Sequence, residues 1–300
     1  MDKKSNFVFL LGAGRSGTTL LYKLLSAHRD VAYLSNYLRI FPEWPLLANL
    51  QRLLNNFPNL KRNTWFDEQG NAYFNRQWLH SIVPTPSECE SVYASCGIPS
   101  VPAEDYCLSP NTVNCLRERF KRILHAAGAQ VLLSKRTSNN RRIPILNQIF
   151  PNAKYIHLVR DGRAVAHSLL YVKWWNDHVL YWTGKSPRQM IAEGADPLEL
   201  AAQQWVEEMY SIEQGIALLQ KDQVLEVRYD ELLKDPCDQL QRILDFMGVT
   251  PQTDTEFWEL IKSLYLSPKQ ESWSHDWLEE ELEKVMTLQG DTLKHWGFLK

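Results

Sequence analysis

Residues 7–19 read Phe7-Val8-Phe9-Leu10-Leu11-Gly12-Ala13-Gly14-Arg15-Ser16-Gly17-Thr18-Thr19, an apolar run that leads directly into a glycine-rich segment. We call residues 12–19 the glycine loop. Leucines recur after it at helical spacing, at positions 20, 21, 24 and 25. Glycines at 12, 14 and 17 permit positive φ and close backbone approach, and a helix that starts behind the loop adds its positive dipole end. The order of strand, loop and helix therefore predicts a site for a phosphate or sulfate group.

The glycine loop nearly matches the G-x-x-x-x-G-K-T pattern of enzymes that bind nucleoside triphosphates. That pattern has a lysine at the position of Thr18, and this lysine contacts the β- and γ-phosphates. A P-loop kinase or triphosphatase that uses Mg²⁺-ATP is therefore an alternative interpretation, and Thr18 argues against it. Arg15 is the only cation of the loop, and we expect its side chain to point outward.

Composition limits the class of protein. The chain has 300 residues, of which 44% are hydrophobic and 23% charged, as in an ordinary globular protein. Its net charge of −2 provides no general attraction for nucleic acid or an anionic membrane. The apolar run at residues 7–11 is too short for a signal peptide, and no stretch reaches the roughly 18 apolar residues of a membrane span. We expect a cytoplasmic protein that binds neither nucleic acid nor a membrane.

The cysteines form no Cys-x-x-Cys pair, and their number is odd: Cys89, Cys96, Cys107, Cys115 and Cys237. This pattern favours reduced thiols over a disulfide framework. Four of the five fall between residues 89 and 115, so a local bridge or a metal site remains an alternative. Zinc ligands usually come in closely spaced pairs, so we expect no bound metal.

Short apolar runs at residues 130–134, 154–159 and 223–228 predict three further buried strands. Helical segments separate them, at residues 117–127, 142–150, 162–171, 198–219 and 236–246. Asp235 and Pro236 mark the start of the last of these helices, and Gly248 marks its end. The alternation predicts an α/β fold with a mostly parallel central sheet flanked by helices, similar to P-loop nucleotide kinases. We expect a single domain over residues 1–300.

Residues 37–115 differ in composition from the rest of the chain, because they are rich in aromatic residues, contain prolines and show no regular pattern. We expect them to form an insert. The insert is predicted to be a helical cap or to line a substrate pocket above the strand ends. A second aromatic cluster at residues 171–182 could face the same crevice. Core packing is the alternative for any single aromatic. The aromatics of the insert are Trp44, Trp65, Tyr73, Phe74, Trp78 and Tyr93.

A second candidate anion site lies at residues 155–168. The apolar run ends at Arg160, which would stand at the carboxyl end of its strand, where open α/β sheets bind ligands. Asp161 is placed to cap the following helix, and Gly162 is expected to let the backbone turn. Ser168 lies two turns into that helix, on the face that follows Arg160. A guanidinium fork combined with a hydroxyl fits a phosphate dianion.

Together these segments resemble sulfotransferases that use 3′-phosphoadenosine 5′-phosphosulfate (PAPS). Residues 15–19 look like the family's 5′-phosphosulfate loop, and residues 159–163 with Ser168 look like its 3′-phosphate motif. Residues 150–154 and 227–232 add to the match, whereas residues 37–130 lie outside it. The nearest patterns are the bacterial-type and the tyrosylprotein sulfotransferases. The resemblance implies PAPS as the donor, no metal, and a small-molecule acceptor such as a natural product.

The resemblance also implies roles for individual residues. Arg160 and Ser168 would hold the 3′-phosphate, and Tyr229 would lie beside the adenine. Lys135 resembles a family lysine that reaches the sulfuryl group, so Arg15 and Lys135 would stabilise the charge that develops during an in-line transfer. The residues expected to hold the 5′-phosphate and sulfuryl oxygens are Gly14, Arg15, Ser16, Gly17, Thr18 and Thr19. A C-terminal cofactor loop would correspond to residues 267–277, with Ser267, Lys269 and Ser272 as candidates.

The acceptor hydroxyl or amine must lose a proton, which calls for a general base. The base of the tyrosylprotein enzymes aligns with Asn36, and that of the cytosolic small-molecule enzymes with Thr137; neither side chain can act as a base. We therefore expect the base in the variable region and name three candidates, Glu43, His80 and Glu90. A catalytically silent nucleotide-binding protein remains the other interpretation of this missing base.

Overall fold

The computed structural model describes residues 6–67, 82–103, 105–250, 254–266 and 273–299. Its described strands form one sheet of five parallel strands in the order β2-β3-β1-β4-β5. Their bounds are β1 Phe7–Leu11, β2 Val31–Tyr33, β3 Val131–Lys135, β4 Lys154–Val159 and β5 Val224–Arg228. The predicted α/β fold with a parallel sheet is therefore confirmed.

Strand β1 occupies the centre of the sheet, with Phe9 paired to Ser134 of β3 and to Tyr155 of β4. The chain leaves β1 towards β2 and β3 on one side, and then crosses to β4 and β5 on the other. Such a reversal of strand order opens a crevice at the carboxyl ends of the strands, where open α/β sheets bind ligands. The glycine loop follows β1 at this position.

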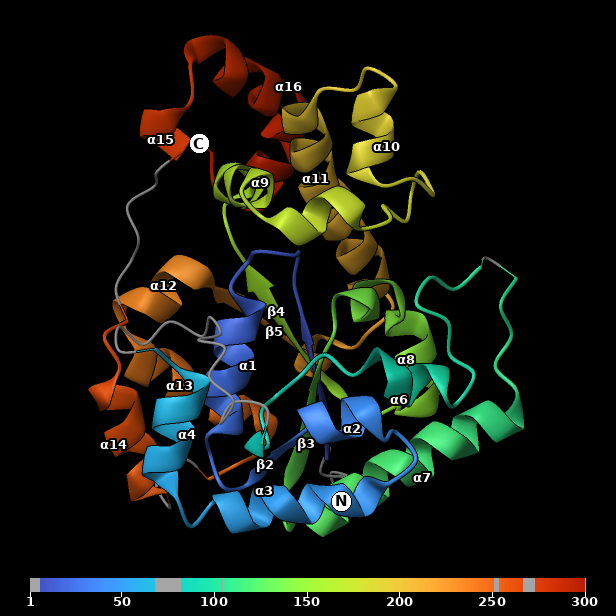
Figure 1. The fold of residues 1–300 in the computed structure, drawn as a ribbon, viewed down its shortest axis with the longest axis vertical. Helices are drawn as coiled ribbons and strands as arrows, with labels where there is room; N and C mark the ends of the chain where they lie inside the picture. The colour runs from blue at the N-terminus through green and yellow to red at the C-terminus, as the bar shows by residue number, and fades with distance from the viewer. Residues whose placement is uncertain (1–5, 68–81, 104, 251–253, 267–272, 300) are drawn as a thin grey trace.

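Helices cover both faces of the sheet, as Figure 1 shows. Helices α1, α12, α13 and α14 lie on one side, and α7 and α8 on the other. Helices α9, α11 and α16 pack together beyond the carboxyl ends of the strands. Because β1 is covered on both faces, Val8 and Leu10 join one buried cluster while Phe9 and Leu11 join the other.

The α-helices of the described residues have the following bounds: α1 Thr18–Ser26, α2 Asn36–Ile40, α3 Asn49–Leu54, α4 Pro58–Trp65, α6 Glu90–Ala94, α7 Pro110–Ala127, α8 Ile143–Ile149, α9 Gly162–Leu170, α10 Pro187–Ala192, α11 Pro197–Ile216, α12 Tyr229–Lys234, α13 Pro236–Met247, α14 Thr255–Ser263, α15 Trp273–Asp276 and α16 Glu279–His295. The 3₁₀ segments are η1 Pro45–Ala48, η2 Thr137–Arg141, η3 Lys173–Asp177 and η4 Lys221–Gln223. Within the part of the chain that is described, no helix has both the length and the apolar composition of a membrane span.

The predicted strands agree with the structure to within one residue, and β2 is the strand that the sequence did not reveal, because three residues give too short a pattern. Helix α7 starts seven residues before the predicted segment. Its true start is a local motif, since Ser109 Oγ accepts a hydrogen bond from Thr112 N at 3.0 Å and Pro110 takes the first helical position. The predicted cap of α13 is confirmed, because the Asp235 carboxylate accepts from Asp238 N at 3.1 Å.

Gly162 was expected to permit a turn, and this explanation is wrong. Its φ lies outside the left-handed region, and it is buried at the first turn of α9. A Cβ at this position would lie 2.4 Å from the Trp205 ring and 2.6 Å from Gln289 Oε1. Glycine is required here because α9 packs closely on α11 and α16.

The insert is helical, as predicted, and two of its aromatics pack in the core, which is the alternative stated above for any single aromatic. Trp65 is buried edge-on against Tyr33, with ring centroids 5.3 Å apart. Tyr93 is buried, and its hydroxyl bonds Ser134 Oγ at 2.6 Å. Trp44 is exposed, whereas Tyr73, Phe74 and Trp78 lie outside the described residues.

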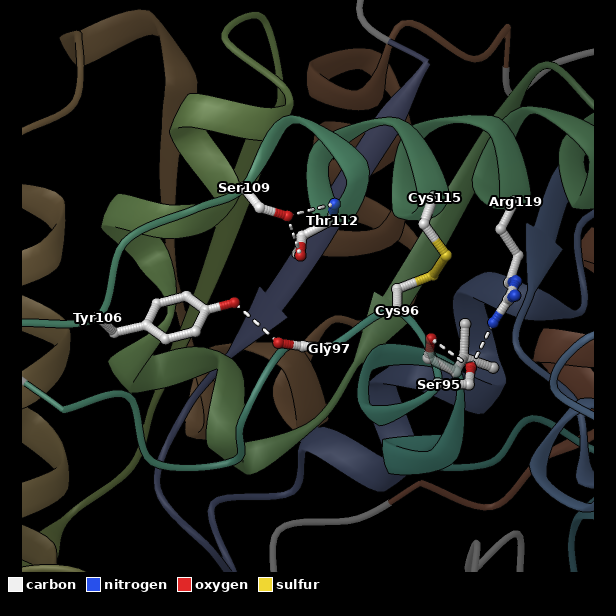
Figure 2. The surroundings of a disulfide bond; sticks show 9 residues. Ser95, Cys96, Gly97, Tyr106, Ser109, Thr112, Cys115 and Arg119 are labelled. Carbon is white, nitrogen blue, oxygen red and sulfur yellow. Dashed lines mark hydrogen bonds between the residues drawn. A yellow bond between two sulfur atoms is a disulfide. The ribbon is translucent and has the colours of Figure 1, made fainter.

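The prediction that the cysteines are all reduced is wrong for one pair. Cys96, directly after α6, forms a disulfide with Cys115 of α7 (Figure 2). Cys89, Cys107 and Cys237 are free thiols. Hydrogen bonds flank the bridge, from Tyr106 Oη to Gly97 O at 2.8 Å and between Arg119 and Ser95. The disulfide links the segment that follows α6 to α7, which packs against one face of the sheet.

Candidate active site

The glycine loop leaves β1 through a backbone that few residue types adopt. Gly12 and Gly17 have φ of 151° and 90°, so the predicted use of positive φ is confirmed at these two positions. Gly14 does not use it, and Arg15 does, with φ of 71°. A non-glycine residue in this region costs on the order of 1 kcal/mol and persists only where its surroundings hold it. The surrounding structure therefore holds the loop in a strained conformation, which is typical of ligand sites.

A buried side-chain network fixes the entrance of the loop. Asn140 Oδ1 accepts from Gly12 N at 3.2 Å, and Asn140 Nδ2 donates to Gly12 O at 3.1 Å. The same Nδ2 donates to Glu208 Oε2 at 2.7 Å, and the other Glu208 oxygen pairs with Arg141 Nη1 at 2.8 Å. Asn140 and Glu208 are both buried. They come from η2 and α11, so two distant segments position the loop, and sequence analysis missed both.

The structure brings the two predicted anion sites together. Arg15 Nε donates to Ser168 Oγ at 3.0 Å, which joins the glycine loop to α9. Arg160, at the end of β4, donates from Nη1 to Arg15 O at 2.8 Å. All three residues are half-buried. The side chain of Arg15 thus turns towards the second site instead of pointing outward as expected, and the cations converge on one region.

Tyr229 begins α12, directly after β5, and lies against both sites. The Arg160 guanidinium stacks over the Tyr229 ring at 4.7 Å. A Cβ at Gly17 would lie 2.2 Å from Tyr229 Cε2, so Gly17 also provides the room in which this ring packs. The predicted adenine neighbour therefore stands between the glycine loop and Arg160. An aromatic face in that position provides a surface for a nucleobase.

Asp161 caps α9 as predicted, because its Oδ1 accepts from Arg163 N at 2.9 Å. The same carboxylate pairs with the Arg163 guanidinium at 2.6 Å. Asp161 therefore sets the direction of the helix that carries Ser168.

Lys135, the last residue of β3, is buried beside the loop, with its Nζ 3.4 Å from Thr19 Oγ1. The lysine also forms an ion pair with Glu88, whose other carboxylate oxygen accepts from Arg136 Nη1 at 2.7 Å. Burial raises the pKa of the Glu88 carboxyl, but Lys135 and Arg136 outweigh burial and lower the pKa to about 2. The region beside the glycine loop therefore contains a carboxylate that sequence analysis missed.

Glu90, one of the three predicted bases, belongs to the same ion-pair cluster as Glu88, because Arg136 contacts both carboxylates. Its carboxylate pairs with Arg136 Nε at 3.0 Å and with Arg142. Arg142 is fully buried and also donates to Pro99 O at 2.8 Å. A buried guanidinium requires a partner of opposite charge, which favours a structural role for Glu90.

Glu43 lies exposed in the turn between α2 and η1, where Arg119 of α7 is a charged neighbour. Four further candidates lie outside the described residues: His80, Ser267, Lys269 and Ser272. No local signal singled out Glu88, because it stands two residues before Glu90 in an irregular segment and only the sheet brings it to Lys135.

A parallel sheet whose central strand leads into a glycine loop, faced by an arginine and a serine from the neighbouring strand and helix, is typical of the P-loop-like α/β class. Comparison with known proteins narrows this further. The sequence profile of the sulfotransferase family matches residues 8–254, and the chain belongs to this family.

Individual relatives are distant. The chain is 24% identical over 262 residues to the omega-hydroxy-beta-dihydromenaquinone-9 sulfotransferase Stf3 of Mycobacterium tuberculosis, covering 81% of this chain and 62% of that protein. It is 24% identical over 251 residues to the protein-tyrosine sulfotransferase of Drosophila melanogaster, covering 83% and 39%. The chain thus spans less than two thirds of these relatives. The crystal structure of sulfotransferase STF9 from Mycobacterium avium superposes with a TM-score of 0.59 at 17% identity, covering 97% of this chain and 77% of that one, and it shares the fold.

Proposed function

We propose that this protein transfers a sulfuryl group from PAPS to a hydroxyl group of a small, largely apolar acceptor. The observation that carries the proposal is the convergence of Arg15, Ser168 and Arg160 beside the glycine loop. Two adjacent cationic subsites fit a nucleotide that carries negative charge at both its 3′ and its 5′ position. Membership of the sulfotransferase family supports the same donor.

Each element of the site has a task in binding. Arg160 and Ser168 bind the 3′-phosphate, and Tyr229 lies beside the adenine. The backbone N–H groups of the glycine loop and the N-terminal end of α1 bind the 5′-phosphate and the sulfuryl oxygens. Thr18 stands where triphosphate enzymes have their lysine, which agrees with a donor that has no β- and γ-phosphates.

During transfer, negative charge accumulates on the oxygen that links the sulfuryl group to the leaving phosphate. We assign the stabilisation of this charge to Lys135, and the 3.4 Å distance from its Nζ to Thr19 Oγ1 at the start of α1 supports the assignment. Arg15 adds a second cation from the loop. Fixed charges of this kind stabilise a transition state without reorganising as the reaction proceeds.

An apolar alcohol or phenol is the acceptor class that the relatives favour. The printed name of the Mycobacterium tuberculosis relative is that of a hydroxylated menaquinone sulfotransferase, and the fly relative is a protein-tyrosine sulfotransferase. Both names describe acceptors that carry a hydroxyl group. We therefore propose oxygen as the acceptor atom.

Calorimetry with 3′,5′-adenosine diphosphate in the presence of EDTA tests the donor site. We expect binding without metal, and loss of at least two orders of magnitude in affinity in Arg160→Ala, in line with the removal of a bidentate charged contact. Arg188→Ala is the matched control, because Arg188 is an exposed arginine whose surface partner is Asp177. Binding of Mg²⁺-ATP without binding of the 3′,5′-diphosphate would instead indicate a kinase or triphosphatase.

Activity is tested by transfer of ³⁵S from labelled PAPS to a panel of phenols, prenyl alcohols and amines. We expect turnover of at least one hydroxyl compound, and strong loss of that turnover in Arg15→Ala and Lys135→Ala. Turnover that both variants retain would show that these residues are not the transition-state cations. Tight nucleotide binding together with neither sulfuryl transfer nor hydrolysis of PAPS would indicate a silent binding protein.

A further inference from the structure

The position at which a related enzyme carries its base is used here to hold a neighbouring segment. Asn36 N donates to Thr85 O at 3.0 Å, and Asn36 Oδ1 accepts from Thr85 N at 3.0 Å. Asn36 Nδ2 also donates to Val83 O at 3.3 Å. Its amide therefore binds the backbone of residues 83–85 on both sides, and this contact requires both a donor and an acceptor on the side chain.

Segment 83–87 continues from there beside the end of β2. Ser87 N donates to Leu34 O at 2.8 Å, and Pro86 forms an antiparallel bridge with Ser35. Because β2 is hydrogen-bonded to β3, this placement brings the next residue, Glu88, to the carboxyl end of β3. The carboxylate that position 36 lacks is thus supplied from position 88, on a segment that Asn36 anchors.

The contacts of Glu88 place it one side chain away from the glycine loop. Its Oε1 pairs with Lys135 Nζ, and the same Nζ lies 3.4 Å from Thr19 Oγ1. Its Oε2 accepts from Arg136 Nη1 at 2.7 Å, which fixes the plane of the carboxylate. The Glu88 side chain keeps 30% of its surface exposed, so an acceptor can approach it.

Three other carboxylates near the site are held by partners other than Lys135. Glu90 pairs with the fully buried Arg142, and Asp161 caps α9. Glu208 is buried beneath the loop, where it binds Asn140 and Arg141. Within the described ranges, Glu88 is the carboxylate that contacts the side chain of Lys135.

We propose that Glu88 is the general base of the transfer reaction and that Lys135 leaves it for the donor when the donor binds. This proposal rests on the proposed function. In the step, the acceptor O–H bond breaks and its proton goes to a Glu88 oxygen. The acceptor oxygen forms a bond to sulfur, and the bond from sulfur to the bridging oxygen breaks with its electron pair on the leaving phosphate, beside Lys135. Glu88 then releases the proton to water.

The charges around Glu88 are consistent with this exchange. While both cations contact the carboxylate, its pKa is about 2 and it is a weak base. The sulfuryl and phosphate oxygens of the donor attract Lys135, and departure of this cation raises the pKa of Glu88 towards its ordinary range. Arg136 stays and keeps the carboxylate oriented. The base is thus activated only when the donor is present, which would limit unproductive proton transfer.

The central experiment compares Glu88→Gln with the wild-type enzyme on two acceptors of different acidity. For the prenyl alcohol farnesol we expect kcat to fall by about 10²- to 10⁴-fold, because this alcohol does not ionise near neutral pH. For p-nitrophenol, which ionises near neutral pH without help, we expect a change of less than about threefold. Glu88→Asp should recover part of the farnesol rate. Equal losses on both acceptors, or unchanged farnesol sulfation, would overturn the proposal.

Two further measurements separate this proposal from the proposed function. Glu88→Gln should bind 3′,5′-adenosine diphosphate at least as tightly as the wild type, because Lys135 no longer has to leave a carboxylate. If the wild type neither binds this nucleotide nor transfers sulfate, the proposed function itself fails. Slow hydrolysis of PAPS by water needs no organic acceptor, and it should fall in Glu88→Gln as farnesol sulfation does; hydrolysis that stays at the wild-type rate argues against the base.

Glu90→Gln provides the matched comparison, because it alters the same ion-pair cluster two residues away. We expect this variant to lower the temperature of thermal unfolding, since it weakens the partner of the buried Arg142. Any loss of activity should be the same for farnesol and p-nitrophenol. A loss confined to farnesol in Glu90→Gln and absent in Glu88→Gln would assign the base to Glu90 instead.

Discussion

Arg15 Nε lies 3.0 Å from Ser168 Oγ, so the arginine of the glycine loop is oriented by a hydroxyl from α9. The carbonyl of the same arginine accepts a hydrogen bond from Arg160 at 2.8 Å. Each of the two proposed anion subsites therefore helps to position a residue of the other. A nucleotide with both phosphates should bind more tightly than the sum of two independent subsites would suggest.

Removal of the Ser168 hydroxyl should weaken nucleotide binding more than an ordinary serine substitution. Ser168→Ala loses a hydrogen bond to a charged group and releases Arg15, so we expect the affinity for 3′,5′-adenosine diphosphate to fall about 10- to 100-fold. Calorimetry measures this change. Ser263→Ala in α14 is the control, because the Ser263 hydroxyl donates to the carbonyl of Leu260 within its own helix at 2.7 Å. Equal affinities in the two variants would contradict the assigned role of Ser168.

The two hydrogen bonds between Asn140 and Gly12 should contribute both to the stability of the protein and to nucleotide binding. Asn140→Ala removes two hydrogen bonds to Gly12 and leaves buried polar groups without partners, so we expect the free energy of unfolding to fall by about 3 kcal/mol. Urea denaturation measures this quantity. Nucleotide affinity should fall as well, because the loop entrance loosens. Glu208→Gln keeps an acceptor for Asn140 Nδ2, so we expect a smaller loss of nucleotide affinity than in Asn140→Ala. An equal or larger loss would show that the charge of Glu208 matters more than the hydrogen bonds between Asn140 and Gly12.

Local patterns allowed the fold to be predicted, together with the two segments that the structure brings together in the candidate site. Strands β1, β3 and β4 are buried on both faces, so each leaves a short, largely apolar run. The glycine loop and the segment from Arg160 to Ser168 each carry their chemistry within a few residues. Asn140, Glu208 and Glu88 follow no such pattern, because their partners are distant in sequence. The disulfide between Cys96 and Cys115 likewise depends on how α6 packs against α7. The need for glycine at position 162 depends on Trp205 in another helix.

Two helical glycines should respond to alanine in opposite directions. A Cβ at Gly215 of α11 would lie 2.6 Å from Ile143 Cδ1 and 2.7 Å from its Cβ, so Gly215→Ala should destabilise the protein by about 1–3 kcal/mol through overpacking. Gly290 of α16 has no such neighbour within 4 Å. Gly290→Ala should therefore stabilise by roughly 0.5–1 kcal/mol through lower backbone entropy of the unfolded chain. Urea denaturation of both variants measures the difference, and the same sign for both would contradict the packing argument.

The disulfide should stabilise the chain mainly by restricting its unfolded state. The two cysteines are 19 residues apart, and a loop of that size is worth about 3 kcal/mol. We expect dithiothreitol to lower the free energy of unfolding of the wild type by that amount. The double variant Cys96→Ala, Cys115→Ala should show the same loss without reductant and no further change with it. A wild type that responds no more strongly to reductant than the double variant would show that the bridge does not form.

A buried histidine should make stability depend on mildly acidic pH. His157 lies within β4 against the ring of Trp296, and its Nε2 has no hydrogen-bond partner among the described residues. Burial lowers the pKa of His157 to about 3, whereas the unfolded chain takes up this proton near pH 6.5. Between these values the unfolded state binds more protons, so the stability contributed by neutral His157 is complete above about pH 6.5 and is lost as the pH falls towards 3.

The expected size of this effect follows from the same two pKa values. Between pH 7.5 and pH 5.5 the free energy of unfolding of the wild type should fall by about 1.4 kcal/mol more than that of His157→Leu, which cannot take up the proton. Urea denaturation at the two pH values measures both losses. His125→Gln is the control, because His125 is exposed at the end of α7 and should leave the wild-type difference unchanged. Identical pH dependence in wild type and His157→Leu would show that His157 can be protonated in the folded protein.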